Sequence, residues 1–122
     1  MDKENPLKNK SYQFALKVLK LYRCLVDQRE FILSKQLLKS GTSIVANVEE
    51  ALQGQSKRDF IAKLSISLKE AYETHYWLRL LRDDGFLETS QLMNLIEDVN
   101  ELIRLLTAII KRTKSTLVEI ER

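Results

Sequence analysis

SGTSIVANVEEA, residues 40–51, decides the fold, because its composition and its periodicity predict different structures. Ser, Gly, Thr and Ser in a row are typical of a loop. Apolar positions nevertheless continue through the stretch at steps of four, three, four and four, where a turn would reset the phase. We therefore predict one helix over about 34–54. Its apolar stripe consists of Leu37, Gly41, Ile44, Val48 and Leu52.

Gly41 is the unusual member of this stripe. A glycine inside a helix costs about 1 kcal/mol relative to alanine. Close packing by a neighbouring backbone would offset that loss, so we expect another helix to approach Gly41 closely.

A second line of residues on the same helix is small or polar. Successive residues turn by about 100°, so positions spaced three and four apart share one face. The interpretations that stay open are small hydroxyls that face water, or a subunit contact or channel wall where short side chains let another helix approach. The line consists of Ser40, Ser43, Asn47, Glu50 and Gly54.

The segment before this helix predicts a first helix over about 11–29, with Ser11 as its N-cap. At the start of the second helix, we expect Ser34 to cap the free amides. Leu33 is expected to pack on Leu38 as a hydrophobic staple. The apolar stripe of the first helix consists of Phe14, Val18, Leu21 and Leu25.

Gly54 marks the clearest boundary in the chain. A glycine here predicts the C-terminal end of the second helix. Ser56, followed by Asp59 three residues later, resembles a capping box in which Asp replaces Glu. We predict a third helix over about 57–82, with a seam typical of helical bundles. The seam consists of Ile61, Leu64, Leu68, Ala71, His75 and Leu78.

Tyr76 and Trp77 lie beside this seam, which indicates either an oligomer interface or a wide core stripe. Gly85 then supplies a tight reversal of the chain. A fourth helix is predicted over about 89–114, with basic residues late in it, as the helix dipole favours. Its apolar stripe consists of Leu92, Ile96, Val99, Ile103, Leu106 and Ile110.

Four amphipathic segments joined by short links predict an all-α, antiparallel up-down-up-down four-helix bundle. At this length we expect one domain over residues 1–122. No apolar run approaches the roughly 18 to 20 residues of a spanning helix, and the N-terminus lacks the apolar core of a signal peptide. We therefore expect a cytoplasmic protein that does not bind membranes. A lone cysteine, Cys24, agrees with a reducing compartment.

The sequence offers no set of residues that specifies a reaction. A di-metal site in a bundle needs Glu-x-x-His on each of two helices, but the chain has one histidine, His75. Glu73 precedes it by only two positions, so the two side chains point about 200° apart. We interpret His75 as a buried, hydrogen-bonded core residue and Cys24 as a small packing residue. We expect no enzymatic activity, no metal, no cofactor and no small-molecule substrate.

The distribution of charge favours a polyanionic partner. The net charge is +3, but residues 1–69 hold 13 Lys and Arg against 7 Asp and Glu, whereas residues 70–122 hold 7 against 10. Lys57 and Arg58 begin the third helix, where free amides also attract anions. Without a sequence-reading motif, such a patch predicts salt-dependent phosphate contact. The asymmetry would alternatively serve docking between subunits.

Residues 34–81 resemble the bacterial four-helix-bundle family that is encoded in intervening sequences of 23S ribosomal RNA genes and often described as ribosomal. The run SGTSIxAN, EEA and DFIxKLxIxLKEAxETxYWL carries the resemblance, and LYRCL and ELIRLLTAIIK extend it on either side. The resemblance implies a small antiparallel bundle that assembles into a ring, typically a pentamer. It also implies similarity to the accessory protein of diversity-generating retroelements, a basic barrel that engages a reverse transcriptase and nucleic acid.

Residues and resemblance together predict a non-enzymatic homo-oligomer, a pentamer by the resemblance, that binds RNA, DNA or a nucleoprotein partner. The alternative is a structural or adaptor assembly that binds no nucleic acid. We assign nucleic-acid contact to Lys35, Lys39, Lys57, Arg58 and Lys63. We assign subunit contact to Ser40, Ser43, Asn47, Tyr76 and Trp77.

Overall fold

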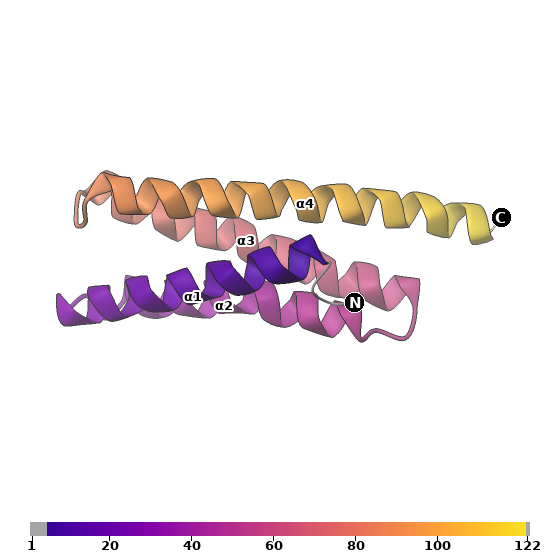
Figure 1. The fold of residues 1–122 in the computed structure, drawn as a ribbon, viewed down its shortest axis with the longest axis horizontal. Helices are drawn as coiled ribbons and strands as arrows, with labels where there is room; N and C mark the ends of the chain where they lie inside the picture. The colour runs from indigo at the N-terminus through magenta and orange to yellow at the C-terminus, as the bar shows by residue number, and fades with distance from the viewer. Residues whose placement is uncertain (1–4, 122) are drawn as a thin grey trace.

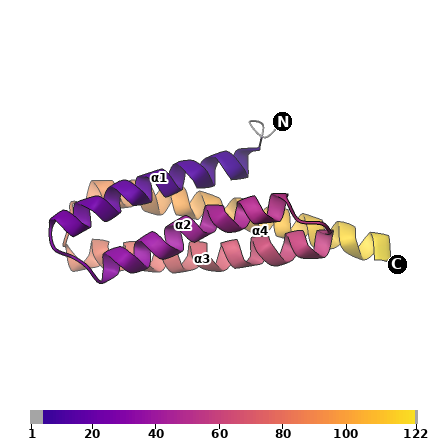
Figure 2. The same ribbon diagram turned by 90° about the horizontal axis from the view of Figure 1, so that it is seen from below.

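The computed structural model describes the backbone of residues 5–121 and the side chains of residues 5–120. The helices run alternately up and down, and short turns join them (Figures 1 and 2). The predicted all-α antiparallel four-helix bundle is therefore confirmed. Its helices are α1 (Pro6–Asp27), α2 (Leu33–Leu52), α3 (Lys57–Asp84) and α4 (Thr89–Glu121).

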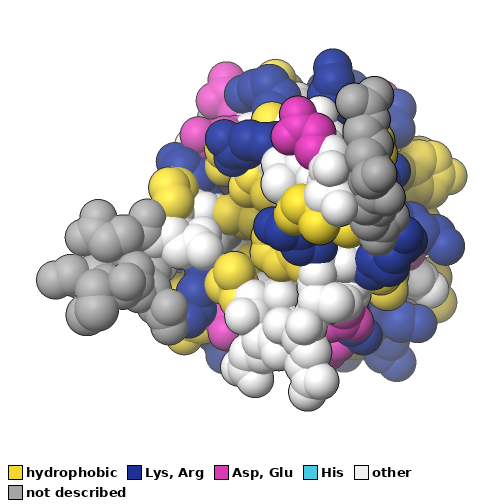
Figure 3. Space-filling view, turned by 90° about the vertical axis from the view of Figure 1, so that its right-hand side faces the viewer, with side chains coloured by type: hydrophobic (Ala, Val, Ile, Leu, Met, Phe, Trp, Pro, Cys, Tyr) yellow, Lys and Arg dark blue, Asp and Glu magenta, His cyan; other side chains and the backbone are white. Residues whose placement is uncertain are grey.

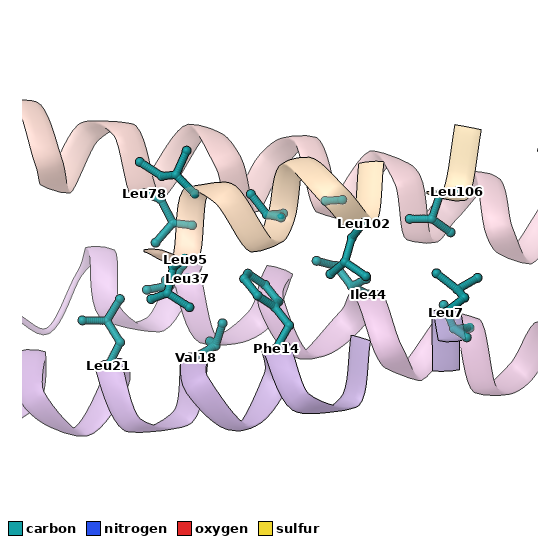
Figure 4. Packing of buried hydrophobic residues seen from close by; sticks show 14 of the residues in the cluster. Leu7, Phe14, Val18, Leu21, Leu37, Ile44, Leu78, Leu95, Leu102 and Leu106 are labelled. Atoms are coloured by element: carbon teal, nitrogen blue, oxygen red, sulfur yellow. The ribbon is translucent and has the colours of Figure 1, made fainter. Parts of the chain in front are cut away.

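The core lies between the four helices, because each contributes apolar residues at helical spacing. Figure 4 shows labelled side chains from all four helices pointing into the same interior. Burial of this stripe on each helix drives the bundle together. The predicted stripes of α1 and α4 are buried except at Ile103, which is partly exposed. In α2, Leu52 lies outside the core.

Helix α1 begins earlier than predicted, and Ser11 is not its N-cap. Asn5 is the N-cap, and its side-chain oxygen accepts a hydrogen bond from the Lys8 amide at 3.0 Å. Pro6 follows at the first helical position, where its missing amide costs nothing. Ser11 is fully buried inside the helix, and its hydroxyl donates to the Lys8 carbonyl at 3.1 Å. The sequence signal for this helix start is the pair Asn5 and Pro6, which the prediction did not use.

Helix α2 is capped by a carboxylate rather than by Ser34. The Glu30 side chain accepts hydrogen bonds from the amides of Leu33 at 3.1 Å and Ser34 at 2.7 Å. A negative charge at this end also complements the helix dipole. The Ser34 hydroxyl is buried, and among the described residues it has no hydrogen-bond partner.

Helix α2 passes through Gly41 without a break, as predicted. A Cβ atom on Gly41 would lie 2.9 Å from both methyl groups of Val18 on α1. The close neighbour is thus a branched side chain, whereas the sequence had suggested a backbone. Gly41 lets α1 and α2 approach each other at the level of Val18.

The turn between α2 and α3 lies where predicted, but Gly54 is not the residue that caps the end of α2. Helix α2 ends at Leu52, and the φ angle of Gly54 is not positive. A Cβ on Gly54 would lie 2.5 Å from the Asp59 carboxylate, so the glycine leaves room for that group. Ser56 caps α3 as predicted, because its hydroxyl oxygen accepts from the Asp59 amide at 3.0 Å. Gly85, at φ 75°, ends α3 in the left-handed conformation.

The buried face of α3 is rotated relative to the predicted seam. Ile61, Leu68 and His75 are only partly buried. Two hydroxyl residues take their place: Ser67 donates to the Ile44 carbonyl at 2.8 Å, and Thr74 donates to the Ser40 hydroxyl at 2.9 Å. The buried line consists of Leu64, Ser67, Ala71, Thr74, Leu78 and Leu81.

Candidate nucleic-acid and subunit interfaces

The five basic residues assigned to nucleic acid do not form one patch. Lys35 and Lys39 lie near the start of α2, whereas Lys57 begins α3 at the opposite end of the bundle. At about 1.5 Å per residue, the helix between Lys39 and Leu52 spans roughly 20 Å. The expectation that Lys35 and Lys39 lie near Lys57 is therefore wrong.

Acidic neighbours partly neutralise two of the five. The Lys63 ammonium lies 3.2 Å from the Glu50 carboxylate, which joins α3 to α2. Burial raises the pKa of Glu70, and the charge of Lys39 lies close enough to oppose that rise. Lys57 and Arg58 lie next to each other at the start of α3.

Folding adds cations from α4 to Lys57 and Arg58. Thr113 on α4 lines a hollow of about 390 Å³ together with Lys57 and Phe60, so α4 passes beside the start of α3 at the level of Thr113. The cations around Thr113 are Lys111, Arg112 and Lys114. We call this end, residues 53–60 and 111–120, the basic end. Figure 3 views it directly and shows many Lys and Arg side chains around apolar ones.

The two ends of the bundle carry opposite net charge. The basic end has five Lys and Arg against two Asp and Glu. At the other end, residues 27–35 and 82–89 have three against five. This asymmetry along the bundle axis differs from the asymmetry along the sequence, because Lys111, Arg112 and Lys114 belong to the acidic half of the chain. A polyanion would be attracted to the basic end.

Side chains, rather than free helix amides, supply the attraction at the basic end. The Asp59 amide is already bonded to Ser56, and the Asp59 carboxylate lies in the first turn of α3. That carboxylate complements the helix dipole in the place where a phosphate would otherwise do so. The sequence-based argument from the helix N-terminus is therefore weakened.

The residues assigned to subunit contact are split between interior and surface. Ser40 is fully buried and accepts the hydrogen bond from Thr74, so it belongs to the packing of α2 on α3 within the chain. Ser43 and Asn47 are half-buried, and the Asn47 amide group donates to the Ser43 carbonyl at 2.9 Å. Both flank the buried stripe of α2.

Helix α3 exposes large apolar side chains on its outer side. Tyr76 packs edge-on against Trp77, with ring centroids 4.9 Å apart, and the Trp77 ring nitrogen donates to Glu73 at 3.2 Å. Such an exposed row is typical of a protein contact. We call it the α3 row: Ile66, Tyr72, Tyr76 and Leu80, each between 38% and 56% exposed.

Glu70 lies between the α3 row and α2 in an unfavourable position for its charge. Burial raises its pKa above the ordinary value of 4.5, the Glu73 charge raises it further, and Lys39 and Lys69 oppose the shift. The ionised form is therefore disfavoured in the fold. This cost is present above the folded pKa and disappears below the unfolded one.

We expect Glu70→Gln to stabilise the protein slightly at pH 7, because glutamine removes the disfavoured charge. The gain should vanish as the pH falls below about 4, where Glu70 is protonated in both states. Urea unfolding at pH 7 and pH 4 measures this. Glu119→Gln, on an exposed turn of α4, is the matched control. A stabilisation by Glu70→Gln that is equal at both pH values would contradict the argument.

His75 and Cys24 are half-buried, so His75 is not the buried core residue that its place on the predicted seam indicated. Burial lowers the pKa of His75, and the charges of Arg79 and Arg82 add to the shift. The Cys24 sulfur accepts a hydrogen bond from the Gln28 side chain at 3.3 Å.

Among the described residues, no group of three or more His, Cys, Asp and Glu is placed to hold a metal ion. Within the same part of the chain, no helix is long and apolar enough to cross a membrane.

These features define an antiparallel four-helix bundle that offers a charged end and an apolar outer row. The chain belongs to the 23S rRNA-intervening sequence protein family, whose model matches residues 3–108. The resemblance drawn from the sequence is therefore confirmed.

One solved structure is similar over nearly its full length. It is a protein of unknown function from the S23 ribosomal protein family of Bacteroides thetaiotaomicron VPI-5482, with 50% identity and a TM-score of 0.84. The match covers 86% of this chain and 98% of that one. No curated protein matches the sequence.

Proposed function

We propose that this chain is a non-enzymatic, oligomeric protein whose basic end binds the phosphate backbone of nucleic acid. One observation carries the proposal: folding places Lys57 and Arg58 at the same end as Lys111 and Arg112, although the two pairs lie far apart in the sequence. Clustered cations bind a polyanion more strongly than scattered ones because they act on neighbouring phosphates.

The proposed contact is to phosphates and not to bases. Phosphate contacts position a protein without reading sequence. The excess of charge at one basic end is small, so a single subunit would bind weakly. Several basic ends in one ring would raise the avidity without any new contact. A ring, by family resemblance a pentamer, is therefore part of the proposal, with Ser43, Asn47, Tyr76 and Trp77 at the subunit contact.

The test replaces three cations of the basic end, Lys57, Lys111 and Arg112, with alanine. We expect weaker binding to an RNA hairpin and to duplex DNA in fluorescence anisotropy. The slope of log K against log salt should fall by about 2 to 3, since each lost phosphate contact contributes about 0.9.

The matched control removes three cations elsewhere, Lys20, Lys35 and Lys39, and should leave the slope nearly unchanged. An equal loss in test and control would show attraction by net charge alone. Absence of binding by the unaltered protein at low salt would refute the proposal.

The α3 row favours a second candidate, an adaptor that recruits a protein partner without nucleic acid. This role predicts that the basic-end variant retains its cellular partners in a pull-down. Tyr72→Ser with Leu80→Ser would lose them, because the partner would contact the exposed apolar groups. The opposite pattern would exclude the adaptor role.

A further inference from the structure

The hollow within the basic end is large enough to receive a small ring system. Its volume is about 390 Å³, and three helices meet around it: the end of α2, the start of α3 and α4 at Thr113. Sites for small molecules usually measure about 300 to 1,000 Å³, so the hollow lies near the lower limit of that range. The lining residues that matter for a ligand are Leu52, Gln55, Ser56, Lys57 and Phe60.

Part of this lining is apolar and includes an aromatic ring. Phe60 is half-buried and packs against the hydrophobic core, so its neighbours hold the ring in place. Leu52, which is 40% exposed, belongs to the same lining. Figure 3 shows apolar side chains at this end with Lys and Arg around them. A ring beside apolar groups suits a nucleobase, because every base has a face that stacks on aromatic side chains.

The turn between α2 and α3 adds hydrogen-bonding groups to the hollow. Gln55 is exposed, and its side-chain amide can both donate and accept. The Ser56 oxygen already accepts from the Asp59 amide, and its hydroxyl can still donate. The edge of a nucleobase carries donors and acceptors that match such groups. The lining therefore suits a base better than a plain hydrocarbon.

Charge favours an anionic ligand in this hollow over the one next to it. In the part of the chain that the structure describes, Lys57 is the one charged residue of the lining. The adjoining hollow has the opposite character, because Glu50 and Asp59 line it beside Lys63. A phosphate would be repelled by those carboxylates and attracted to the basic end.

We propose that the hollow receives one unpaired nucleobase of a nucleic acid whose neighbouring phosphates lie on the basic end. Phe60 stacks on the base, Gln55 and Ser56 bond to its edge, and Lys57 contacts the adjoining phosphate. The inference rests on the proposed function and adds one contact to its phosphate contacts. Because stacking accepts any base, the contact distinguishes unpaired from paired nucleotides and reads no sequence.

The test compares two RNA duplexes with the same number of phosphates, one fully paired and one with a single bulged nucleotide. Stacking on an aromatic side chain contributes about 5- to 150-fold in affinity per base. We expect the unaltered protein to bind the bulged duplex about tenfold more tightly in fluorescence anisotropy at low salt. Phe60→Leu keeps an apolar group but removes the ring, so the preference should fall to about twofold or less. Phe60→Tyr keeps the ring and should retain the preference.

Phe86→Leu is the matched control, because Phe86 is also half-buried against the core but lies in the turn between α3 and α4. It should retain the preference, and both leucine variants should bind the paired duplex as the unaltered protein does. Equal binding of the two duplexes by the unaltered protein, or equal behaviour of the two leucine variants, overturns the inference. Salt-dependent binding of the paired duplex would then leave the proposed function standing. Binding of neither duplex overturns both.

Discussion

Replacing Gly41 by leucine is expected to lower the free energy of unfolding by about 3 kcal/mol or more. The side chain would have to occupy space that the Val18 methyl groups already fill, 2.9 Å from the position of the first added carbon. Val18 is fully buried, and its branched side chain has one strongly preferred rotamer in a helix. Overpacking of this kind costs about 1 to 3 kcal/mol and occasionally more. Urea unfolding measures the change.

Gly41→Ala is the sharper version of the same test. Alanine improves helix propensity by about 1 kcal/mol, but its methyl group meets Val18. We expect a net loss of stability in the unaltered protein and a gain when Val18 is also alanine. Ala46→Leu, on the exposed side of α2, should change stability little. If Gly41→Ala has the same effect in both backgrounds, Val18 is not the cause.

The second large effect is expected at Phe14, which lies between α1 and α4. Its side chain is only 2% exposed, so Phe14→Ala removes a large buried ring and leaves a cavity. Such substitutions cost about 3 to 5 kcal/mol. The free energy of unfolding should fall by that amount in chemical denaturation.

Ion pairs that bridge the same two helices should matter far less. Lys10 lies 3.1 Å from Glu101, and Lys17 lies 2.7 Å from Asp98. Because these groups are partly exposed, each pair contributes about 0 to 1 kcal/mol. Lys17→Ala is therefore the comparison for Phe14→Ala. A larger loss from Lys17→Ala would show that charge, and not burial, holds α1 to α4.

The four helices could be predicted from the sequence because apolar periodicity reports burial directly. The apolar periodicity through residues 40–51 correctly predicted a helix, although the composition of that stretch is typical of a loop. The same reasoning misplaced the buried face of α3, since it followed apolar residues and left Ser67 and Thr74 out of the seam. Their hydroxyls bond to α2, and only the neighbouring helix reveals those partners.

The candidate site could be predicted only in part. Lys57 and Arg58 were found from their place at a helix start. Lys111 and Arg112 were interpreted as complements of the helix dipole, because the sequence does not show that α4 passes beside the start of α3. Lys35 was grouped with Lys57 although antiparallel helices place them at opposite ends. Helix direction, and not residue type, decides which charges meet.

An NMR titration of the isotope-labelled protein with a short RNA hairpin at low salt tests the central claim most directly. The account predicts that amide shifts concentrate in residues 56–60 and 109–116 and fade as salt is added. Shifts confined to the α3 row, or none at all under the same conditions, would contradict the claim that the basic end binds phosphates.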